Sequence, residues 1–299
     1  MKNMYLHRCL GLILISLGIL CLIATQTHAE TFTWVKDIYL NPLVGDNESI
    51  EVDVVGNQLY VANWEQNKYF RIDPFTGNLL SSFYLGSGLW IDNHGSEYNP
   101  TTGLILHANE AGGALAVDSF FATNTNGVVV QGPYPLAIPG SRNPEGLTVD
   151  PKTGRVWVSL ESRGGGPDGI FQIDPDNGKV LNHIDVGPAW ALGFNPNSGK
   201  LFFADQNGVI KEVAPDGTGL ATVFDPNAGE IFGMAFTPTG DLVLLQFGTT
   251  TPPSRLLLFD SSNDADNVFT TQAVPEPGIL ILLGISMASI VGLRRWWKE

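Results

Sequence analysis

The side chains of this 299-residue chain that could do chemistry are carboxylates placed near the ends of predicted strands. Four of them, from separate parts of the chain, could converge on one ion or one polyhydroxylated ligand. Carboxylate and amide oxygens are the ligands that Ca²⁺ prefers, so we take these four as candidate ligands of Ca²⁺ or another divalent cation. They are Glu110, Glu145, Glu161 and Asp205. The alternative is that they are solvated loop ends, since no EF-hand-like spacing accompanies them.

Groups suited to nucleophilic or general-base catalysis are few. Beyond residue 29 the histidines are His94, His107 and His183, and the last two fall inside predicted strands. Ser159 lies close to an acidic residue in sequence, but nothing places a histidine base beside it. The run Gly164–Gly166 precedes a proline rather than a helix and is no phosphate loop. We therefore assign no catalytic and no cofactor-binding residue.

Repeated hairpins are the elements that would position the carboxylates. In each copy an apolar strand runs into a tight turn ending in glycine, usually Asx-Pro-x-x-Gly, and a second apolar strand follows. Proline presets one turn dihedral, and glycine accepts a positive φ. Second hairpins follow several copies, for example at Asp73–Gly77 and Asp174–Gly178. The turn glycines of the first hairpins, spaced by 47, 51, 45 and 41 residues, are Gly56, Gly103, Gly154, Gly199 and Gly240.

Two hairpins in each repeat make a four-stranded sheet, and radial repetition of such sheets makes a β-propeller. We therefore predict an all-β propeller of about five blades over residues 30–273. Six blades is the alternative, because 84–100 and 117–144 are irregular enough to hide strands; a β-sandwich would leave the recurring turn unexplained. The strand Phe32–Leu40 is expected to close the ring on the last blade. The residues before each first strand and after each second strand then share one end.

The positions of the cysteines and the net charge limit which bonds stabilise the domain and which partners it can bind. Both cysteines, Cys9 and Cys21, lie in the first 29 residues, so the remaining chain has no disulfide and no thiolate metal site. Residues 30–277 contain 11 basic and 29 acidic residues, a net charge of −18. Such a domain repels phosphate backbones, which excludes nucleic acid as a partner and leaves cations, neutral sugars or proteins.

The ends of the chain have the composition of export signals. Lys2 and Arg8 precede a short apolar run and a polar stretch ending in alanine, which predicts a signal peptide over 1–29, exported through the Sec translocon. A permanent anchor is the alternative. At the other end, the uncharged apolar segment 278–293 predicts a transmembrane helix about 24 Å long. The basic cluster after it would stay cytoplasmic, placing the preceding domain outside.

Residues 274–299 resemble the PEP-CTERM sorting signal of Gram-negative bacteria. The resemblance rests on Val274-Pro275-Glu276-Pro277, on the apolar helix after it, and on Arg294 and Arg295. It implies an exosortase as processing partner and a precursor tethered to the inner membrane. The processed protein would then reach the cell surface or the extracellular matrix, often in species that make extracellular polysaccharide.

The stretch Asn143–Asp150 resembles the repeat of NHL-type and gluconolactonase-like propellers. The resemblance supports the architecture. We expect a non-enzymatic exported propeller that binds polysaccharide or a surface protein. The alternative is a metal-dependent, lactonase-like hydrolase that uses acids such as Glu145 and Glu161 at a central site.

Overall fold

The computed structural model describes residues 30–40, 49–55, 58–63, 66–85, 93–111, 117–138, 143–161, 166–248 and 254–261. The predicted signal peptide and sorting tail lie outside these ranges. Among the described residues, no helix is long and apolar enough to cross a membrane. The described strands belong to one compact unit, Phe32–Glu299.

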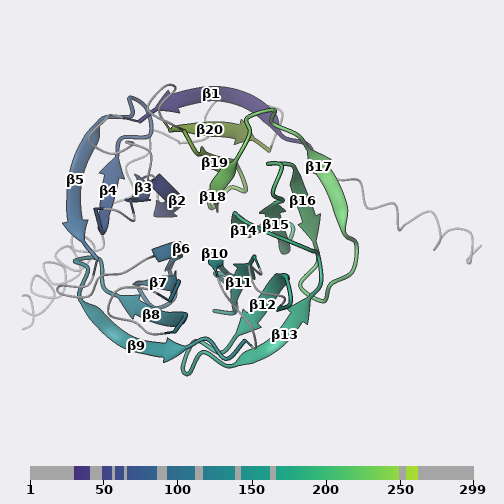
Figure 1. The fold of residues 1–299 in the computed structure, drawn as a ribbon. Helices are drawn as coiled ribbons and strands as arrows, with labels where there is room; N and C mark the ends of the chain where they lie inside the picture. Colours follow the sequence, from purple (N-terminus) through teal and green to yellow (C-terminus); the bar gives the residue numbers. More distant parts are fainter. Residues whose placement is uncertain are drawn as a thin grey trace, which may run out of the picture. The chain divides into compact units, whose positions relative to one another are not determined.

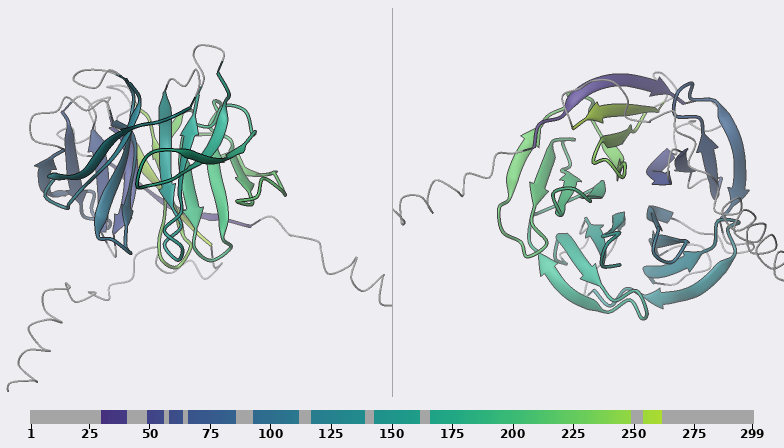
Figure 2. Two further views of the ribbon diagram at one scale, coloured as in Figure 1. Left: turned by 90° about the horizontal axis from the view of Figure 1, so that it is seen from below. Right: turned by 180° about the vertical axis from the view of Figure 1, so that it is seen from behind.

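The described elements are twenty strands in five four-stranded antiparallel sheets, which surround a central axis as the blades of a propeller (Figures 1 and 2). Blade 1 contains β2 (Ser49–Val55), β3 (Gln58–Asn63), β4 (Lys68–Ile72) and β5 (Leu79–Tyr84). Blade 2 contains β6 (Asn93–Asn99), β7 (Leu104–Asn109), β8 (Ser119–Thr123) and β9 (Val129–Pro135). Blade 3 contains β10 (Pro144–Val149), β11 (Val156–Leu160), β12 (Gly169–Ile173) and β13 (Val180–Ile184). Blade 4 contains β14 (Leu192–Asn195), β15 (Lys200–Ala204), β16 (Ile210–Val213) and β17 (Ala221–Phe224).

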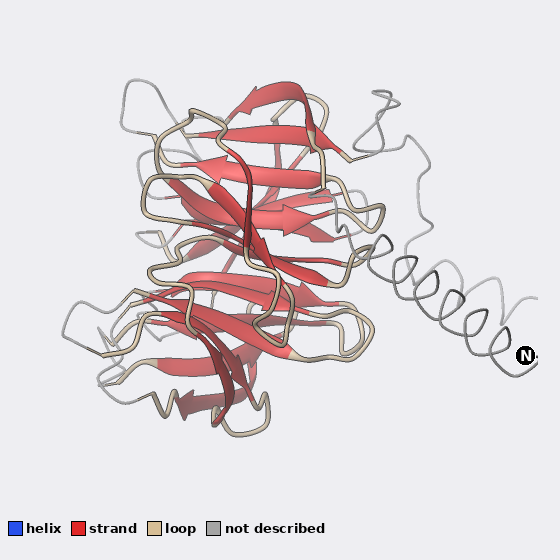
Figure 3. Cartoon of the chain, turned by 90° about the vertical axis from the view of Figure 1, so that its right-hand side faces the viewer, coloured by secondary structure: helices blue, strands red, loops and turns tan. Residues whose placement is uncertain are grey.

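The ring is closed by a strand from the start of the unit. Blade 5 contains β18 (Ile231–Phe236), β19 (Leu242–Gln246) and β20 (Arg255–Asp260), and its outermost strand is β1 (Thr33–Tyr39), which pairs antiparallel with β20. The predicted five blades and the predicted closing strand are both confirmed. The irregular segments that could have hidden a sixth blade instead supply strands of blade 2. Every element of regular secondary structure among the described residues is a strand (Figure 3).

In blades 2 to 5, the hairpin between the inner strand and its neighbour turns as the sequence predicts. In blade 3 the carboxylate of Asp150 accepts the amide N–H of Lys152 at 2.8 Å, and the Asp150 carbonyl accepts that of Gly154 at 2.8 Å. Gly154 has φ +71°, a conformation that side chains with a Cβ rarely adopt. These turns define the hairpin end of the central channel. The opposite end, where the inner strands begin, is called the loop end.

Apolar side chains between neighbouring blades form the core, but the five interfaces are not alike. Between blades 3 and 4, Trp157 stacks on Phe194 with ring centroids 5.6 Å apart. Between blades 1 and 2 the apolar cluster is small and surrounds a polar group, in which the Tyr69 hydroxyl bonds to Ser96 and lies 3.4 Å from Asp53. Polar groups of blades 1 and 2 therefore reach the centre of the fold.

Candidate functional site

A bulge opens the inner strand of blades 1, 2, 3 and 5 at the loop end. In blade 3, Pro144 pairs with Leu160 and Gly146 with Ser159, which leaves Glu145 as an extra residue. The equivalent bulge residues are Ile50, His94 and Phe232. In blade 4, Trp190 holds the same position just before β14, because its amide N–H donates to the Ala204 carbonyl while the Ala204 amide donates to the Ala191 carbonyl. A bulge re-aims the side chain of its extra residue, and bulges are common beside functional sites. The fold thus places one such position from each blade at the loop end, around the axis of the propeller. The surface formed by these positions and the residues next to them is called the loop-end mouth.

The bulges bring neighbouring inner strands close together, and a glycine follows several of them. A Cβ added to Gly146 would lie 2.7 Å from the carbonyl oxygen of Trp190. One added to Gly95 would lie 2.6 Å from the carbonyl carbon of Gly146. Glycine is needed at these two positions because the backbones of neighbouring inner strands are in contact there. This contact holds the bulge residues of blades 2, 3 and 4 side by side.

Blades 2 and 3 supply an acidic half of the mouth, centred on a histidine. His94 Nε2 lies 3.6 Å from Glu110 Oε2, and His94 Nδ1 lies 3.5 Å from Glu145 Oε2. Asn143 Nδ2 donates to Glu145 Oε1 at 2.7 Å. The Glu145 side chain is 3% exposed, whereas that of Glu110 is 26% exposed. A protonated His94 would therefore be paired with one buried and one accessible carboxylate.

Blades 4 and 5 supply an aromatic half. The rings of Trp190 and Phe232 lie 5.1 Å apart, and those of Phe232 and Phe247 lie 4.9 Å apart. All three side chains are half-buried. The two halves adjoin where the Ser159 hydroxyl donates to the Trp190 carbonyl at 2.9 Å, next to Gly146.

The four candidate metal ligands do not share one position. Glu110 and Glu145 meet on His94, and the amide N–H of Glu161 donates to the Asn143 carbonyl at 3.2 Å. Asp205 pairs with Lys211 at 2.8 Å. Partial burial works to raise the pKa of Asp205, but the Lys211 hydrogen bond and two backbone amides outweigh it and hold that pKa low.

In the described part of the chain, no group of three or more His, Cys, Asp or Glu side chains has the geometry of a metal site. The metal site proposed from sequence therefore stays a prediction.

Sequence reasoning missed His94 and the aromatic half of the mouth. A signal for them was present, because each bulge residue after the first blade precedes a small residue: His94-Gly95, Glu145-Gly146, Trp190-Ala191 and Phe232-Gly233. Aligning the repeats on this pair, rather than on the turn glycine, would have put the four side chains in one column.

Buried carboxyl groups on the inner strands were also missed. Glu51 accepts the amide N–H of Met234 and of Ser96, both at 3.4 Å, and so bridges two neighbouring blades. Asp53 accepts the amide N–H of Tyr98 at 3.1 Å. Burial raises the pKa of Asp53 to about 7, and burial followed by the charge of Asp53 raises the pKa of Glu51 well above its usual value. These acids connect blades and line no metal site.

No family model matches the chain, and no curated protein matches it. Among solved structures, the chain is similar to a gluconolactonase of Xanthomonas campestris (15% identity, TM-score 0.47), over 68% of this chain and 69% of that one. It is similar to a streptogramin B lyase (12% identity, TM-score 0.49), over 78% of this chain and 100% of that one. A chain of a nidogen/laminin complex matches at 17% identity and TM-score 0.45, over 60% and 67% of the two chains. At such identities and TM-scores these likenesses say nothing about what this chain binds.

Proposed function

We propose that this protein is an exported binding protein whose propeller holds a neutral polysaccharide at the loop-end mouth of its channel. The observation that carries the proposal is the two-sided mouth: an acidic and amide half on blades 2 and 3 beside an aromatic half on blades 4 and 5. No catalytic step is needed to explain this arrangement.

The two halves match the two surfaces of a sugar ring. The apolar C–H face of a pyranose can pack on half-buried aromatic rings such as Trp190 and Phe232, which combine a large apolar area with a rigid shape. Its hydroxyl groups can donate to the carboxylate of Glu110. The buried side-chain oxygens of Asn109 and Asn143 accept no hydrogen bond from the described residues, so buried waters beneath the mouth would satisfy them.

The net charge of the domain and its predicted location at the cell surface both favour a neutral polysaccharide as ligand. The net charge of −18 over residues 30–277 repels anionic polysaccharides and leaves neutral ones. The predicted signal peptide and the predicted sorting tail 274–299 would deliver the propeller to the cell surface after exosortase processing. A host that makes extracellular polysaccharide would then supply the ligand at that location.

Affinity electrophoresis of the full-length protein through a gel containing the host's neutral polysaccharide tests the proposal. We expect retardation of the wild type, loss of retardation in Trp190→Ala, and no change in Trp34→Ala. Trp34 is a matched control because it is 59% exposed on the outermost strand β1, away from the mouth. Equal migration of all three proteins, with and without polysaccharide, would overturn the proposal.

One observation favours the lactonase-like alternative. His94 lies within ion-pair distance of two carboxylates, an arrangement that can orient an imidazole as a general base. This alternative predicts turnover of a lactone that depends on Ca²⁺ or another divalent cation, with Glu145→Gln and Glu161→Gln losing metal binding while staying folded. A metal titration unchanged in both variants would remove it.

A further inference from the structure

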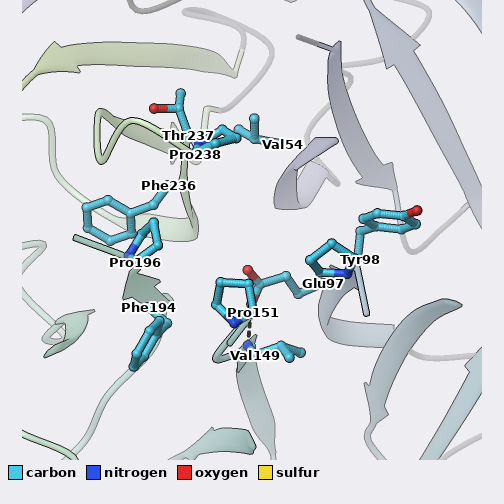
Figure 4. Close-up of a pocket in the computed structure, with 11 residues that line it drawn as sticks. Val54, Glu97, Tyr98, Val149, Pro151, Phe194, Pro196, Phe236, Thr237 and Pro238 are labelled. Carbon is cyan, nitrogen blue, oxygen red and sulfur yellow. Dashed lines mark hydrogen bonds between the residues drawn. The ribbon is translucent and has the colours of Figure 1, made fainter. Parts of the chain in front are cut away.

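The hairpin end of the channel holds a cavity of about 340 Å³, lined by residues from all five blades (Figure 4). This volume falls within the range of small-molecule sites, roughly 300–1,000 Å³. The prolines of four turns, one from each of blades 2 to 5, surround it. They are Pro100, Pro151, Pro196 and Pro238. The repeat that builds the fold therefore also builds an apolar rim.

Hydrogen bonds from blade to blade hold this rim in place. The Thr101 hydroxyl donates to the Pro151 carbonyl at 3.1 Å, and the Lys152 ammonium donates to the Pro196 carbonyl at 2.8 Å. Asn197 Nδ2 donates to the Thr239 carbonyl in the next turn. Because each turn is tied to its neighbour, the opening is formed before any ligand arrives.

Aromatic rings in the wall are fixed from behind by the interblade core. Phe194 is stacked on Trp157, and Phe236 packs edge-on against Phe202 with ring centroids 5.0 Å apart. Each ring is in contact with a fully buried partner, so it is not free to fall into the cavity. The wall is then a preformed apolar surface, of the kind that binds the hydrocarbon body of a ligand.

One carboxyl group opens on this apolar cavity. Glu97 lines the cavity and accepts the amide N–H of Val149 at 2.6 Å, a contact drawn in Figure 4. Among the described residues, no Lys or Arg pairs with it. Burial first, and then the nearby charge of Asp53, raises the pKa of Glu97 well above its usual value. The group therefore has a hydrogen-bonding partner but no countercharge from the described part of the chain.

We propose that this cavity binds a small organic ammonium ion, with its hydrocarbon body against the proline and phenylalanine rings and its ammonium group on the Glu97 carboxylate. The ligand supplies the positive charge that the cavity lacks, and aromatic faces such as that of Phe194 attract it further. The net charge of −18 over residues 30–277 concentrates cations around the domain. This site is separate from the proposed polysaccharide site and does not depend on it.

The proton balance of binding gives a signature. Because burial raises the pKa of Glu97, any proton that Glu97 carries in the free cavity leaves to the buffer when the ammonium ion binds, while the ammonium keeps its own. We expect net proton release on binding, and less of it as the pH rises. Calorimetry in two buffers of different ionisation enthalpy measures that release directly.

The probes are cyclohexylmethylammonium and its neutral isostere cyclohexylmethanol, titrated at pH 7 into the full-length protein in nanodiscs, with empty nanodiscs subtracted. We expect the ammonium ion to bind and Glu97→Gln to weaken it by about tenfold or more, because a charge-assisted hydrogen bond is lost. The glutamine oxygen can still accept the Val149 amide, so this variant should stay folded. Val54→Phe, which fills the cavity from blade 1, should abolish binding, and Asp176→Asn on an exposed outer turn should not change it.

Each other outcome contradicts the proposal. Binding that is equal for the alcohol and the ammonium ion would show an apolar site without charge recognition. Binding unchanged in both Glu97→Gln and Val54→Phe would place the cation elsewhere on the acidic surface. No heat with either probe at millimolar concentration would leave the cavity to water alone.

Discussion

The two ends of the channel are built by the same repeat but differ in how much they vary from blade to blade. At the hairpin end, blades 2 to 5 contribute the same residue type, a turn proline, to one apolar rim. At the loop end, the equivalent bulge positions contribute different residues: Ile50, His94, Glu145, Trp190 and Phe232. A turn needs particular residues to form, whereas a bulge fixes only where its side chain points. The loop end is therefore where this fold can carry specificity without loss of the blade.

Buried carboxyl groups on the inner strands lie between the two ends. Their raised pKa values should make the free energy of unfolding depend on pH. The pKa of Asp53 is raised from 3.8 to about 7, so between these values the unfolded chain has lost a proton that the folded chain keeps. Stability then falls as pH rises from about 4 to 7, by up to about 4 kcal/mol. Glu51, Glu97 and Tyr69 face Asp53, and the raised pKa values of the two glutamates act in the same direction.

Urea unfolding of the full-length protein between pH 4 and pH 8 measures this slope. Asp53→Asn should remove a large part of it, while Asp176→Asn on an exposed turn should leave it unchanged. The amide of Phe75 lowers the pKa of Asp73, so protonation of Asp73 decreases the free energy of unfolding only below about pH 4. Stability that rises with pH from 5 to 8 would contradict buried, neutral carboxyl groups in the channel.

A pair of glycine substitutions compares the two ends directly. Gly146→Ala pushes a Cβ against the backbone of blade 4 at the loop end, and we expect a loss of about 3 kcal/mol. Gly154→Ala at the hairpin end meets nothing within 4 Å and only strains a positive φ, for about 1 kcal/mol. Denaturant midpoints of the two variants measure the difference. Equal losses would mean that the inner strands do not meet as closely as described.

Substitutions at the two ends should affect the binding of different ligands. Trp190→Ala should weaken neutral polysaccharide binding by about tenfold or more, since it removes an aromatic platform, and should leave ammonium binding unchanged. Glu97→Gln should weaken ammonium binding and leave polysaccharide binding unchanged. Parallel titrations of both variants with both ligands measure this. Loss of binding of both ligands in one variant would indicate that the two ends form a single continuous site.

The smallest effect is expected at the hairpin rim. Pro196→Ala keeps the Asn195 turn contact, in which Oδ1 accepts the Asn197 amide at 2.9 Å, and mainly gives the unfolded chain more freedom. We expect a loss of at most about 1 kcal/mol and no change in polysaccharide binding, checked by thermal unfolding and affinity electrophoresis. A larger loss would mean that the proline ring supports the rim by packing.

The fold could be predicted from sequence because its signals are local. A turn such as Asp150–Gly154 is specified by residues adjacent in the chain, and the repeat spacing then gives the blades. The closing strand followed from the need to cover an edge. The polar contacts of Glu51 between blades could not be predicted, because Glu51 of blade 1 meets Met234 of blade 5 across 183 residues of sequence.

The candidate site could be predicted only in its location. Their places after the second strands put Glu110 and Glu161 at the correct end, but gave no sign that Glu145 would meet Glu110 through His94. Asp205 follows the second strand of blade 4 in the same way, and the sequence did not show that it would pair with Lys211. The decisive feature is a bulge, which adds one residue to a strand and changes the direction of a side chain. Its signal, a small residue after the bulge residue, becomes visible only when the repeats are aligned on that pair.

The central claim is that the loop-end mouth binds a neutral polysaccharide, and the most direct measurement is a crystal structure of the protein with an oligosaccharide from the host's own polymer. We expect a sugar ring packed on Trp190 and Phe232, with hydroxyl groups directed at Glu110. A sugar seated on an outer strand or in the hairpin-end cavity, with the mouth free of it, would contradict the account.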